Sequence, residues 1–371
     1  MQSPGPDMPG SDRSDAGLSA SRFMSPEGSG SGDPGPGGSR AGGLGGRAPD
    51  CLIVAGPTCS GKSALALALA MRLGGTVINA DSMQVYAGLH ILTARPDPGD
   101  EALAPHRLYG VRSPAEPGNV AWWREAALSA MEAAWAAGRL PILCGGTGLY
   151  LRALTDGLSA IDDPGDAARA EARAMLAGIG SAAMHARLAE VDPDSAARLR
   201  PSDGQRVARA WEVWRGTGRG MAEWASVPGL PAAPYRFTAI RLAPPRPVLR
   251  AAIAARFDAM LERGAMEEVR ALLALDLSPE LPAMRAHGVP ELSAVLRGEC
   301  DLADATRRAV SSQARYTKRQ ATWFAHHPLA KTRRTVILEK RMAGIQQEIE
   351  RFADKLIPFV RSDVDAPGVF A

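Results

Sequence analysis

Short apolar runs alternate with alanine-rich helical runs over the first half of the ordered sequence. We predict strands at the apolar runs, which are Cys51–Ala55, Thr76–Ala80, Arg107–Val111 and Leu140–Cys144. We predict helices at Ala64–Leu73 and Val120–Ala137, where the pattern suits one buried face. Strands that alternate with helices indicate an α/β fold with a parallel sheet covered on both faces, and ligands bind at the carboxyl ends of such strands.

The pattern changes near residue 162, where Ala, Arg and Glu become frequent and β-branched residues become rare. A strand pattern returns at Phe237, and helical patterns follow at Val248–Leu275, Asp301–Phe324 and Lys340–Val360. Asp301 or Asp304 is a plausible N-cap of the second of these helices. We therefore predict an α/β core of residues 50–161 and 235–328, a helical insert of residues 162–234, and a C-terminal extension of residues 329–371 with a peripheral helix.

Residues 1–49 consist mainly of Gly, Ser, Pro, Asp and Arg, and they contain almost no aliphatic side chains. This composition predicts a disordered extension, or a start codon assigned too far upstream. The chain has no run of about 18 apolar residues that would predict a membrane span. Its four cysteines have no paired spacing, which fits a reducing, cytoplasmic compartment. We expect a monomer.

Positive charge is concentrated in the second half of the chain. The formal net charge is +3, yet residues 198–334 hold 23 Lys and Arg against 13 Asp and Glu. A basic half suggests a polyanionic partner such as a nucleic acid, although a solvated, arginine-rich surface explains the same count equally well.

The clearest chemical motif follows the first predicted strand and precedes the first predicted helix. It consists of Gly56, Pro57, Thr58, Cys59, Ser60, Gly61, Lys62 and Ser63. In this context the backbone N–H groups of the loop cradle phosphates, the lysine adds a positive charge, and the Ser63 hydroxyl can ligate Mg²⁺. The chain therefore binds a diphosphate or a triphosphate.

Two further candidates lie at predicted strand ends. Asp81 follows the second strand, where it could act as a general base, hold Mg²⁺ through water, or simply cap a helix. Thr147 follows Gly145 and Gly146 at the end of the fourth strand, and could contact a diphosphate or cap the next helix. That strand end carries no acidic residue, which argues against a nucleotide-hydrolysing motor.

Basic residues suggest where RNA could bind. Arg206 and Arg209 lie three residues apart on one predicted helix face, and the segment Arg315–Phe324 mixes cations with aromatic rings. Both patterns suit phosphate contacts and base stacking. Both also occur on ordinary helices whose charged face meets water.

The chain resembles the bacterial tRNA dimethylallyltransferases, also called tRNA isopentenyltransferases. The matching blocks run in order through the core and are Gly56–Ser63, Asp81–Gly88, Thr93–Pro96, Pro105–Leu108, Pro141–Tyr150, Gln205–Arg209 and Lys318–Phe324. The resemblance implies a P-loop NTPase-like core with a helical insert. It also implies transfer of a dimethylallyl group from dimethylallyl diphosphate to N6 of the adenosine 3′-adjacent to the anticodon, with Mg²⁺ present and diphosphate leaving.

The resemblance also implies roles for individual residues. Asp81 matches the general base, Gly56–Ser63 match the diphosphate loop, and Thr147 and Arg169 match positions at the reacting centre or on the tRNA. Further positions implied to contact the tRNA anticodon stem-loop are Asp81, Ser82, Met83, Gln84, Gln205, Arg206, Val207, Ala208, Arg209, Arg285, His287 and Gly288.

Three departures from the family pattern affect these expectations. Leu92 stands where glycine is usual, Val289 and Pro290 replace a common Tyr–Lys/Arg pair, and Ala314 stands where arginine is frequent. The alternatives to a prenyltransferase are a small-metabolite or nucleotide kinase, which would consume ATP, and an RNA-binding module with a vestigial phosphate site.

Overall fold

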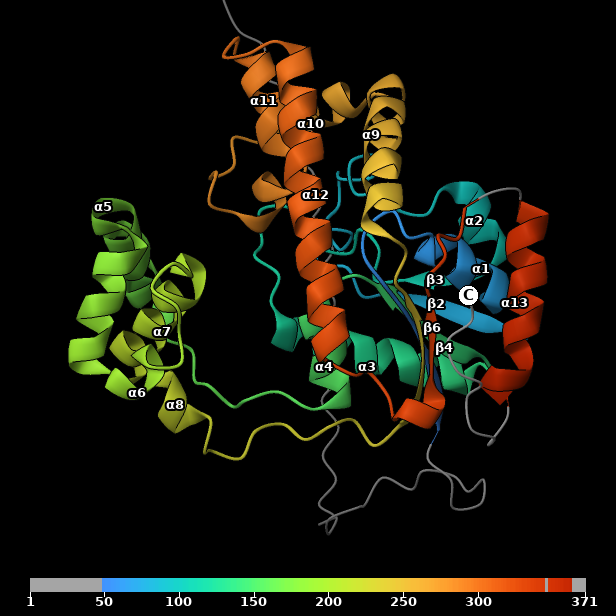
Figure 1. Ribbon diagram of the computed structural model, residues 1–371, viewed down its shortest axis with the longest axis horizontal. Coiled ribbons are helices and arrows are strands. Elements are labelled where there is room, and N and C mark those ends of the chain that lie inside the picture. The colour runs from blue at the N-terminus through green and yellow to red at the C-terminus, as the bar shows by residue number, and fades with distance from the viewer. Residues whose placement is uncertain (1–48, 344–345, 362–371) are drawn as a thin grey trace, which may run out of the picture. The chain divides into compact units, whose positions relative to one another are not determined.

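A parallel sheet of six strands forms the centre of the structure (Figure 1), a computed structural model that describes residues 49–343 and 346–361. Its strands are β1 (Asp50–Ala55), β2 (Gly75–Asn79), β3 (His106–Arg107), β4 (Leu140–Gly145), β5 (Arg236–Leu242) and β6 (Thr335–Leu338). Their spatial order is β3-β2-β4-β1-β5-β6, and every neighbouring pair is parallel. The predicted α/β fold is thereby confirmed. Residues 1–48, almost the whole of the predicted disordered extension, lie outside the described residues.

Two strands differ from the sequence prediction. The strand predicted at Arg107–Val111 has only two residues, because the chain turns at Leu108 and Gly110, whose φ angles are +64° and +60°. The edge strand β6 pairs with β5 but was not predicted, since four residues beside a basic turn give too little pattern to identify a strand.

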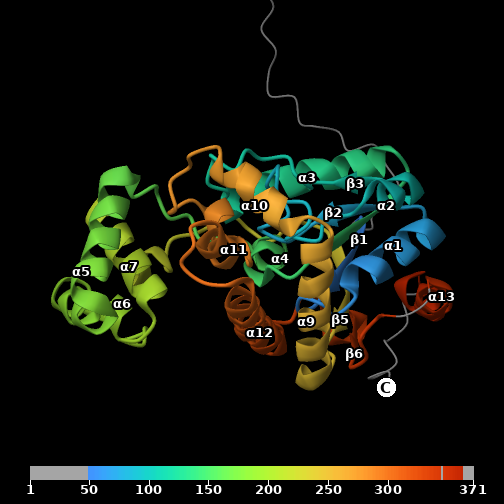
Figure 2. The same ribbon diagram turned by 90° about the horizontal axis from the view of Figure 1, so that it is seen from above.

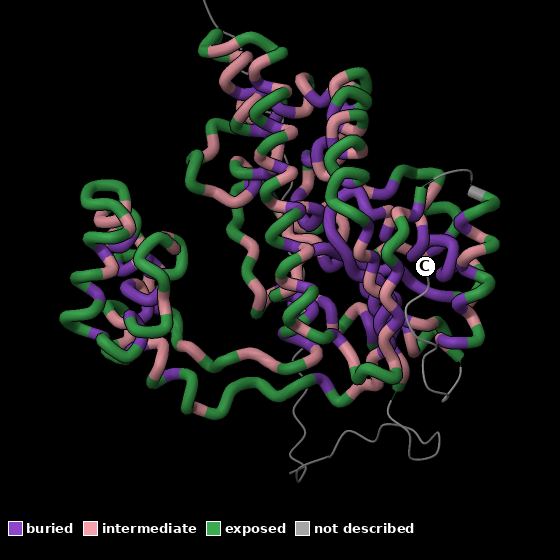
Figure 3. Tube along the Cα trace, in the orientation of Figure 1, coloured by how far each residue is buried: buried purple, intermediate pink, exposed green. Residues whose placement is uncertain are grey.

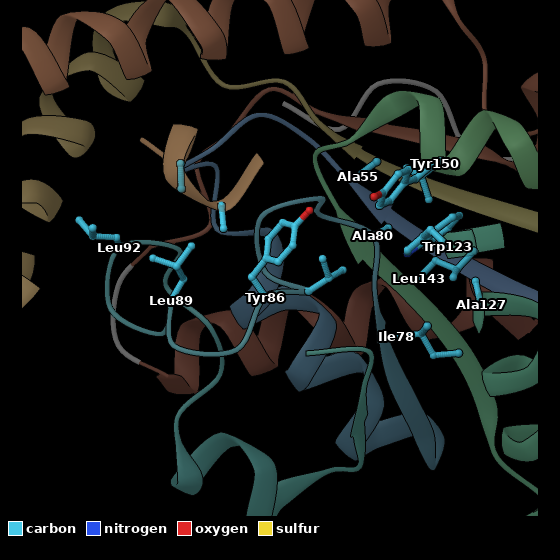
Figure 4. Close-up of a cluster of buried hydrophobic side chains, with 14 of the residues drawn as sticks. Ala55, Ile78, Ala80, Tyr86, Leu89, Leu92, Trp123, Ala127, Leu143 and Tyr150 are labelled. Atoms are coloured by element: carbon cyan, nitrogen blue, oxygen red, sulfur yellow. The ribbon is translucent and has the colours of Figure 1, made fainter. Parts of the chain in front are cut away.

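Helices cover both faces of the sheet, and the alternation of side chains along each strand divides the core in two. On one face Ile53 and Leu143 pack with α3 (Val120–Ala136) and α4 (Gly148–Thr155), where Trp123 stacks on Tyr150 with ring centroids 4.5 Å apart (Figure 4). On the other face Leu52 packs with α1 (Lys62–Leu73). Figure 3 shows buried residues along the strands between these layers. The short α2 (Pro98–Leu103) has no buried residue.

The amphipathic run predicted as one helix at Val248–Leu275 forms two helices instead. They are α9 (Arg246–Glu262) and α10 (Ala265–Leu273), and Gly264 separates them with a φ of +96°. After α11 (Val289–Leu296), the long helix α12 (Leu302–His326) begins where predicted, because the Asp301 carboxylate accepts the backbone N–H of Asp304 at 2.7 Å.

Only helices lie between residues 162 and 234 in the described structure. They are α5 (Gly165–Val191), α6 (Pro193–Ala196), α7 (Gly204–Thr217) and α8 (Met221–Trp224). They have a small core of their own that includes Met184, Leu188 and Trp211. The two connecting segments pair through Leu158 and Leu230, which exchange backbone hydrogen bonds of 2.9 and 2.8 Å. The exact domain boundaries stay predictions.

The last helix, α13 (Gln346–Arg361), begins six residues later than predicted. It lies beside α1 (Figure 2) and buries Ile349, Ala353 and Leu356 in the core on that face of the sheet. Arg72 of α1 also donates to Glu350 and Asp354 of α13, each at 2.9 Å. The C-terminal extension therefore supplies part of the core, which its sequence pattern did not reveal.

Truncating Leu356 tests this packing. We expect Leu356→Ala to lower the free energy of unfolding by about 2–5 kcal/mol, because a fully buried leucine loses its contacts and leaves a cavity. Urea denaturation followed by circular dichroism measures the change. The exposed neighbour Lys355, changed to alanine, is the control. Equal stability of the two variants would show that α13 does not pack on α1.

Candidate active site

The phosphate loop, residues 56–61, joins β1 to α1 at the carboxyl edge of the sheet. Gly61 and Cys59 have φ angles of +89° and +65°, the left-handed conformation that curves a loop so that successive N–H groups converge. The N–H groups of the first turn of α1 have no acceptor within their own helix, and this end of a helix is electropositive. Lys62 and Ser63 stand in that turn. The loop and this turn stand where an anion cradle was predicted, and their role as the diphosphate site stays a prediction.

The end of β4 brings the candidates Asp81 and Thr147 together. The backbone N–H of Ala80 donates to Cys144 at 2.8 Å, and the N–H of Thr147 donates to Ala80 at 3.1 Å. Gly145 is required at this crossing, because a Cβ there would lie 2.1 Å from the Ala80 carbonyl. The Thr147 hydroxyl then accepts the N–H of Ser82 at 2.9 Å. Thr147 thus fixes the backbone that follows Asp81.

The Asp81 carboxylate is half-buried and oriented by its own backbone. Its Oδ1 accepts the Met83 N–H at 3.0 Å, and its backbone N–H donates to the Asn79 side chain at 2.8 Å. Within the described residues, Oδ2 has no hydrogen-bond partner. A carboxylate with one oxygen fixed and the other available is suited to accept a proton from a bound substrate.

Helix α12 contributes polar side chains from the segment Arg315–Phe324, which the sequence predicted to contact RNA. Burial, followed by the charge of Asp81, raises the pKa of Tyr316 to about 12, so its hydroxyl remains protonated. The Gln320 amide oxygen accepts the N–H of Thr58 at 2.9 Å, and its NH₂ group donates to the Gly146 carbonyl at 3.0 Å. Gln320 therefore ties the phosphate loop to the end of β4.

Asp81 lies on the wall of a cavity of about 770 Å³. Several predicted residues line the same cavity, namely Thr58, Ser82, Met83, Gln205, Ala208, Arg285 and His287. Residues of the α/β core and of the helices α5 and α7 therefore line the same cavity. Two of the lining residues form an ion pair, with Arg173 Nε of α5 lying 3.9 Å from Glu280 Oε2. The structure brings the core and insert predictions to one site.

Other predicted residues lie away from this cavity lining. Arg169 pairs with Asp166 at 2.8 Å and also with Asp163, and Val207 is buried in the core of the helical insert. Arg206 and Arg209 pair with Asp203 at 3.5 Å and Glu212 at 3.1 Å. The Gln84 amide donates to the carbonyls of Thr93 and Ala94. The roles of these residues at the tRNA or the reacting centre stay predictions.

Arg319, which lies in the predicted RNA-contacting segment Arg315–Phe324, also lines the cavity, and so does Arg256, to which the sequence patterns assigned no role. The Arg256 Nε is buried and has no hydrogen-bond partner among the described residues. Arg319 lies over the Tyr316 ring, 5.5 Å from its centroid. Arg256 belongs to no short sequence motif. It reaches the cavity because α9, on which it lies, packs against α12.

Of the residues that depart from the family pattern, Leu92 lies on the cavity wall. Leu92 lines the cavity and packs against Gly288, where an added Cβ would lie 2.7 Å from the Leu92 side chain. Gly288 has a φ of +96°, Val289 is buried, and Pro290 is exposed as the second residue of α11. Leu92 thus fills space beside a turn that only glycine adopts easily.

The residues present fit a Mg²⁺ ion held mainly by water and substrate phosphates. The described residues contain no group of three or more His, Cys, Asp or Glu side chains that would enclose a metal. Ser63 directly follows the phosphate loop in the first turn of α1, where its hydroxyl could ligate the ion. Mg²⁺ is commonly bound by one or two such oxygens together with phosphates.

Known proteins share this arrangement. The family model described as IPP transferase matches residues 84–327. The tRNA dimethylallyltransferase of Gluconobacter oxydans (strain 621H) is 62% identical over 315 residues, which cover 85% of this chain and 95% of that protein. The protein of the same name from Gluconacetobacter diazotrophicus is 61% identical and covers 86% of this chain and 96% of its own length.

Solved structures agree with these sequence relatives. The full-length tRNA isopentenylpyrophosphate transferase of Bacillus halodurans has a TM-score of 0.59 at 30% identity, over 85% of this chain and 97% of its own. A eukaryotic dimethylallyltransferase acting on tRNA has a TM-score of 0.69 at 24% identity. The match covers 87% of this chain and 82% of that protein, and at this identity it supports the fold alone. The sheet with its phosphate loop is P-loop NTPase-like. No helix among the described residues is long and apolar enough to cross a membrane.

His287 makes stability depend on pH. Its ring lies 4.9 Å from that of Tyr316, and burial, followed by the nearby Arg319, lowers its pKa. The folded protein therefore binds this proton less readily than the unfolded chain, so stability falls as the pH drops below about 6.5.

We expect the free energy of unfolding to fall less between pH 7 and pH 5 in His287→Gln than in the wild type. Urea denaturation at each pH measures it, and the exposed His326, changed to glutamine, is the control. Parallel curves for the wild type and His287→Gln would contradict the assignment.

Proposed function

The chain belongs to the tRNA dimethylallyltransferase family, and we propose that it transfers the dimethylallyl group of dimethylallyl diphosphate to N6 of the adenosine 3′-adjacent to the anticodon. The observation that carries this proposal is the placement of Asp81. Asp81 lines a cavity that Thr58 of the phosphate loop also lines. A proton acceptor and a diphosphate site therefore adjoin, as alkylation of an amine with loss of diphosphate requires.

The roles of the side chains follow from their contacts. Asp81 accepts the proton of the exocyclic amine as the new C–N bond forms, while Thr147 holds the segment that follows Asp81 through the N–H of Ser82. The loop N–H groups and Lys62 neutralise the departing diphosphate. Mg²⁺, held through Ser63, would add to that charge neutralisation when bound. Arg256, whose buried Nε has no hydrogen-bond partner within the described residues, is a further cation for the diphosphate or the RNA.

We propose that the tRNA anticodon stem-loop enters from the side of α5 and α7. Gln205, Arg285, His287 and Arg319 line the cavity with donors and rings that suit an unstacked base and its phosphates. Arg169, Arg206 and Arg209 would extend the contact along the stem. The described cysteines are free thiols, in keeping with a reducing, cytoplasmic compartment, and we propose that the protein acts as a monomer.

The alternatives from the sequence lack comparable support. The relatives are named as transferases rather than kinases, and β4 ends in Gly145 without an acidic residue. An RNA-binding module with a vestigial site would not require the orientation of Asp81.

Removing the base tests the proposal. We expect Asp81→Asn to lower prenyl transfer by about 10²–10⁴-fold, because the amide still accepts the Met83 N–H but cannot take a proton. Mass spectrometry of digested tRNA nucleosides measures the transfer, and filter binding measures tRNA affinity, which should stay unchanged. Asp156→Asn, at an exposed carboxylate, is the control. Wild-type turnover in Asp81→Asn would eliminate Asp81 as the base.

The RNA contact has its own test. We expect Arg319→Gln to weaken tRNA binding and to reduce the slope of log K against log salt by about 0.7–0.9, the value for one phosphate contact. The control is Arg333→Gln, because Arg333 is exposed and precedes β6 at the opposite edge of the sheet. An unchanged slope in Arg319→Gln together with a changed slope in Arg333→Gln would contradict tRNA binding at this cavity and would indicate binding near Arg333 instead.

A further inference from the structure

The phosphate loop is contacted by the strap, which we define as residues 339–343 between β6 and α13. The backbone N–H of Met342 donates to the Ser60 carbonyl at 2.9 Å, and the Arg341 Nε donates to the Cys59 carbonyl at 2.9 Å. Two consecutive strap residues therefore bind two consecutive loop carbonyls. The strap lies beyond residues 84–327, which match the family model.

Packing between the strap and the loop is close. A Cβ added at Gly61 would lie 1.7 Å from the Met342 carbonyl oxygen, so the strap backbone occupies the space that any other side chain would need. The Met342 side chain is buried in the core on the α1 face of the sheet. The strap is thus held at both of its ends, by β6 paired with β5 and by α13 packed on α1 (Figure 2).

The contacts use the side of the loop that an anion does not need. An anion is bound by backbone N–H groups, whereas the strap engages only the carbonyls of Cys59 and Ser60. On the opposite flank, Gln320 holds the N–H and hydroxyl of Thr58. Two elements distant in sequence therefore fix the loop, and the N–H groups at the start of α1 remain available to the ligand.

We propose that Arg341 is a positioning residue that pre-organises the phosphate loop for the diphosphate of the prenyl donor, an inference that rests on the proposed function. Arg341 touches neither the substrate nor the reacting atoms in this account. It acts through the Cys59 carbonyl, and the strap thereby couples the C-terminal extension to donor binding. Without this charged hydrogen bond the loop samples conformations that do not bind diphosphate, and the apparent affinity falls with the competent fraction.

The test compares Arg341→Ala and Arg341→Lys with Arg351→Ala, which removes an exposed arginine from α13. We expect Arg341→Ala to raise both the KM for dimethylallyl diphosphate and the Kd for inorganic diphosphate with Mg²⁺, measured by calorimetry, by about tenfold. The kcat should fall less than about threefold, and the Kd for tRNA should stay unchanged. Lysine should restore part of the affinity because it can still donate to the Cys59 carbonyl, and Arg351→Ala should match the wild type.

The outcomes separate this proposal from the proposed function. A wild-type Kd for diphosphate in Arg341→Ala overturns the positioning role, even if the melting temperature falls. An equal loss of diphosphate and tRNA affinity also overturns it, because that indicates general destabilisation. If Arg341→Ala does not fold, Arg341→Lys and Arg341→Gln decide by the same binding measurement. A wild-type protein that binds diphosphate but leaves tRNA unmodified would refute the proposed function alone, and the calorimetry would still test the strap.

Discussion

The close crossing of the chain at Ala80 and Gly145 is the constraint on which the site depends. Two backbone hydrogen bonds join the end of β2 to the end of β4, and glycine is needed because a Cβ would collide with the Ala80 carbonyl. This crossing places Asp81 beside Thr147 and directs both toward the edge of the sheet where the phosphate loop lies. Asp81 and the phosphate loop follow different strands, β2 and β1, and the crossing fixes the position of the first of them.

The loop itself is shaped by elements from the far end of the sequence. Gln320 of α12 and the strap near Arg341 bind its two flanks, so that the anion-binding N–H groups need little rearrangement when a diphosphate arrives. Pre-organised donors stabilise developing negative charge more effectively than donors that must first be oriented. The core, α12 and the C-terminal extension therefore act on one loop.

Sequence patterns were sufficient to predict the position of a candidate site residue where that position depends on consecutive residues. The strand, loop and helix around Lys62 are contiguous, and Asp81 follows a buried strand, so their relation to the sheet could be inferred before the structure. Thr147 was ambiguous in sequence, and the hydrogen bond from Ser82 shows its local role.

Residues brought in by tertiary packing could not be predicted in this way. Arg256 lies within a helix whose sequence pattern reports only burial, and the hydrogen-bond partners of Gln320, Thr58 and Gly146, are far away in the chain. The break at Gly264 and the turn at Leu108 depend on positive φ angles, which hydrophobic periodicity does not encode. The strap likewise has no sequence signature, because it acts through the backbone of Met342 and a single arginine.

The claim that the phosphate loop holds a leaving diphosphate is tested most directly by following both products in one reaction. Purified protein is incubated with dimethylallyl diphosphate, Mg²⁺ and total tRNA, with and without ATP, and released diphosphate is compared with prenylated adenosine in the digested tRNA. The account predicts one diphosphate for each modified adenosine, with no requirement for ATP. Rapid hydrolysis of ATP with unmodified adenosine would contradict it.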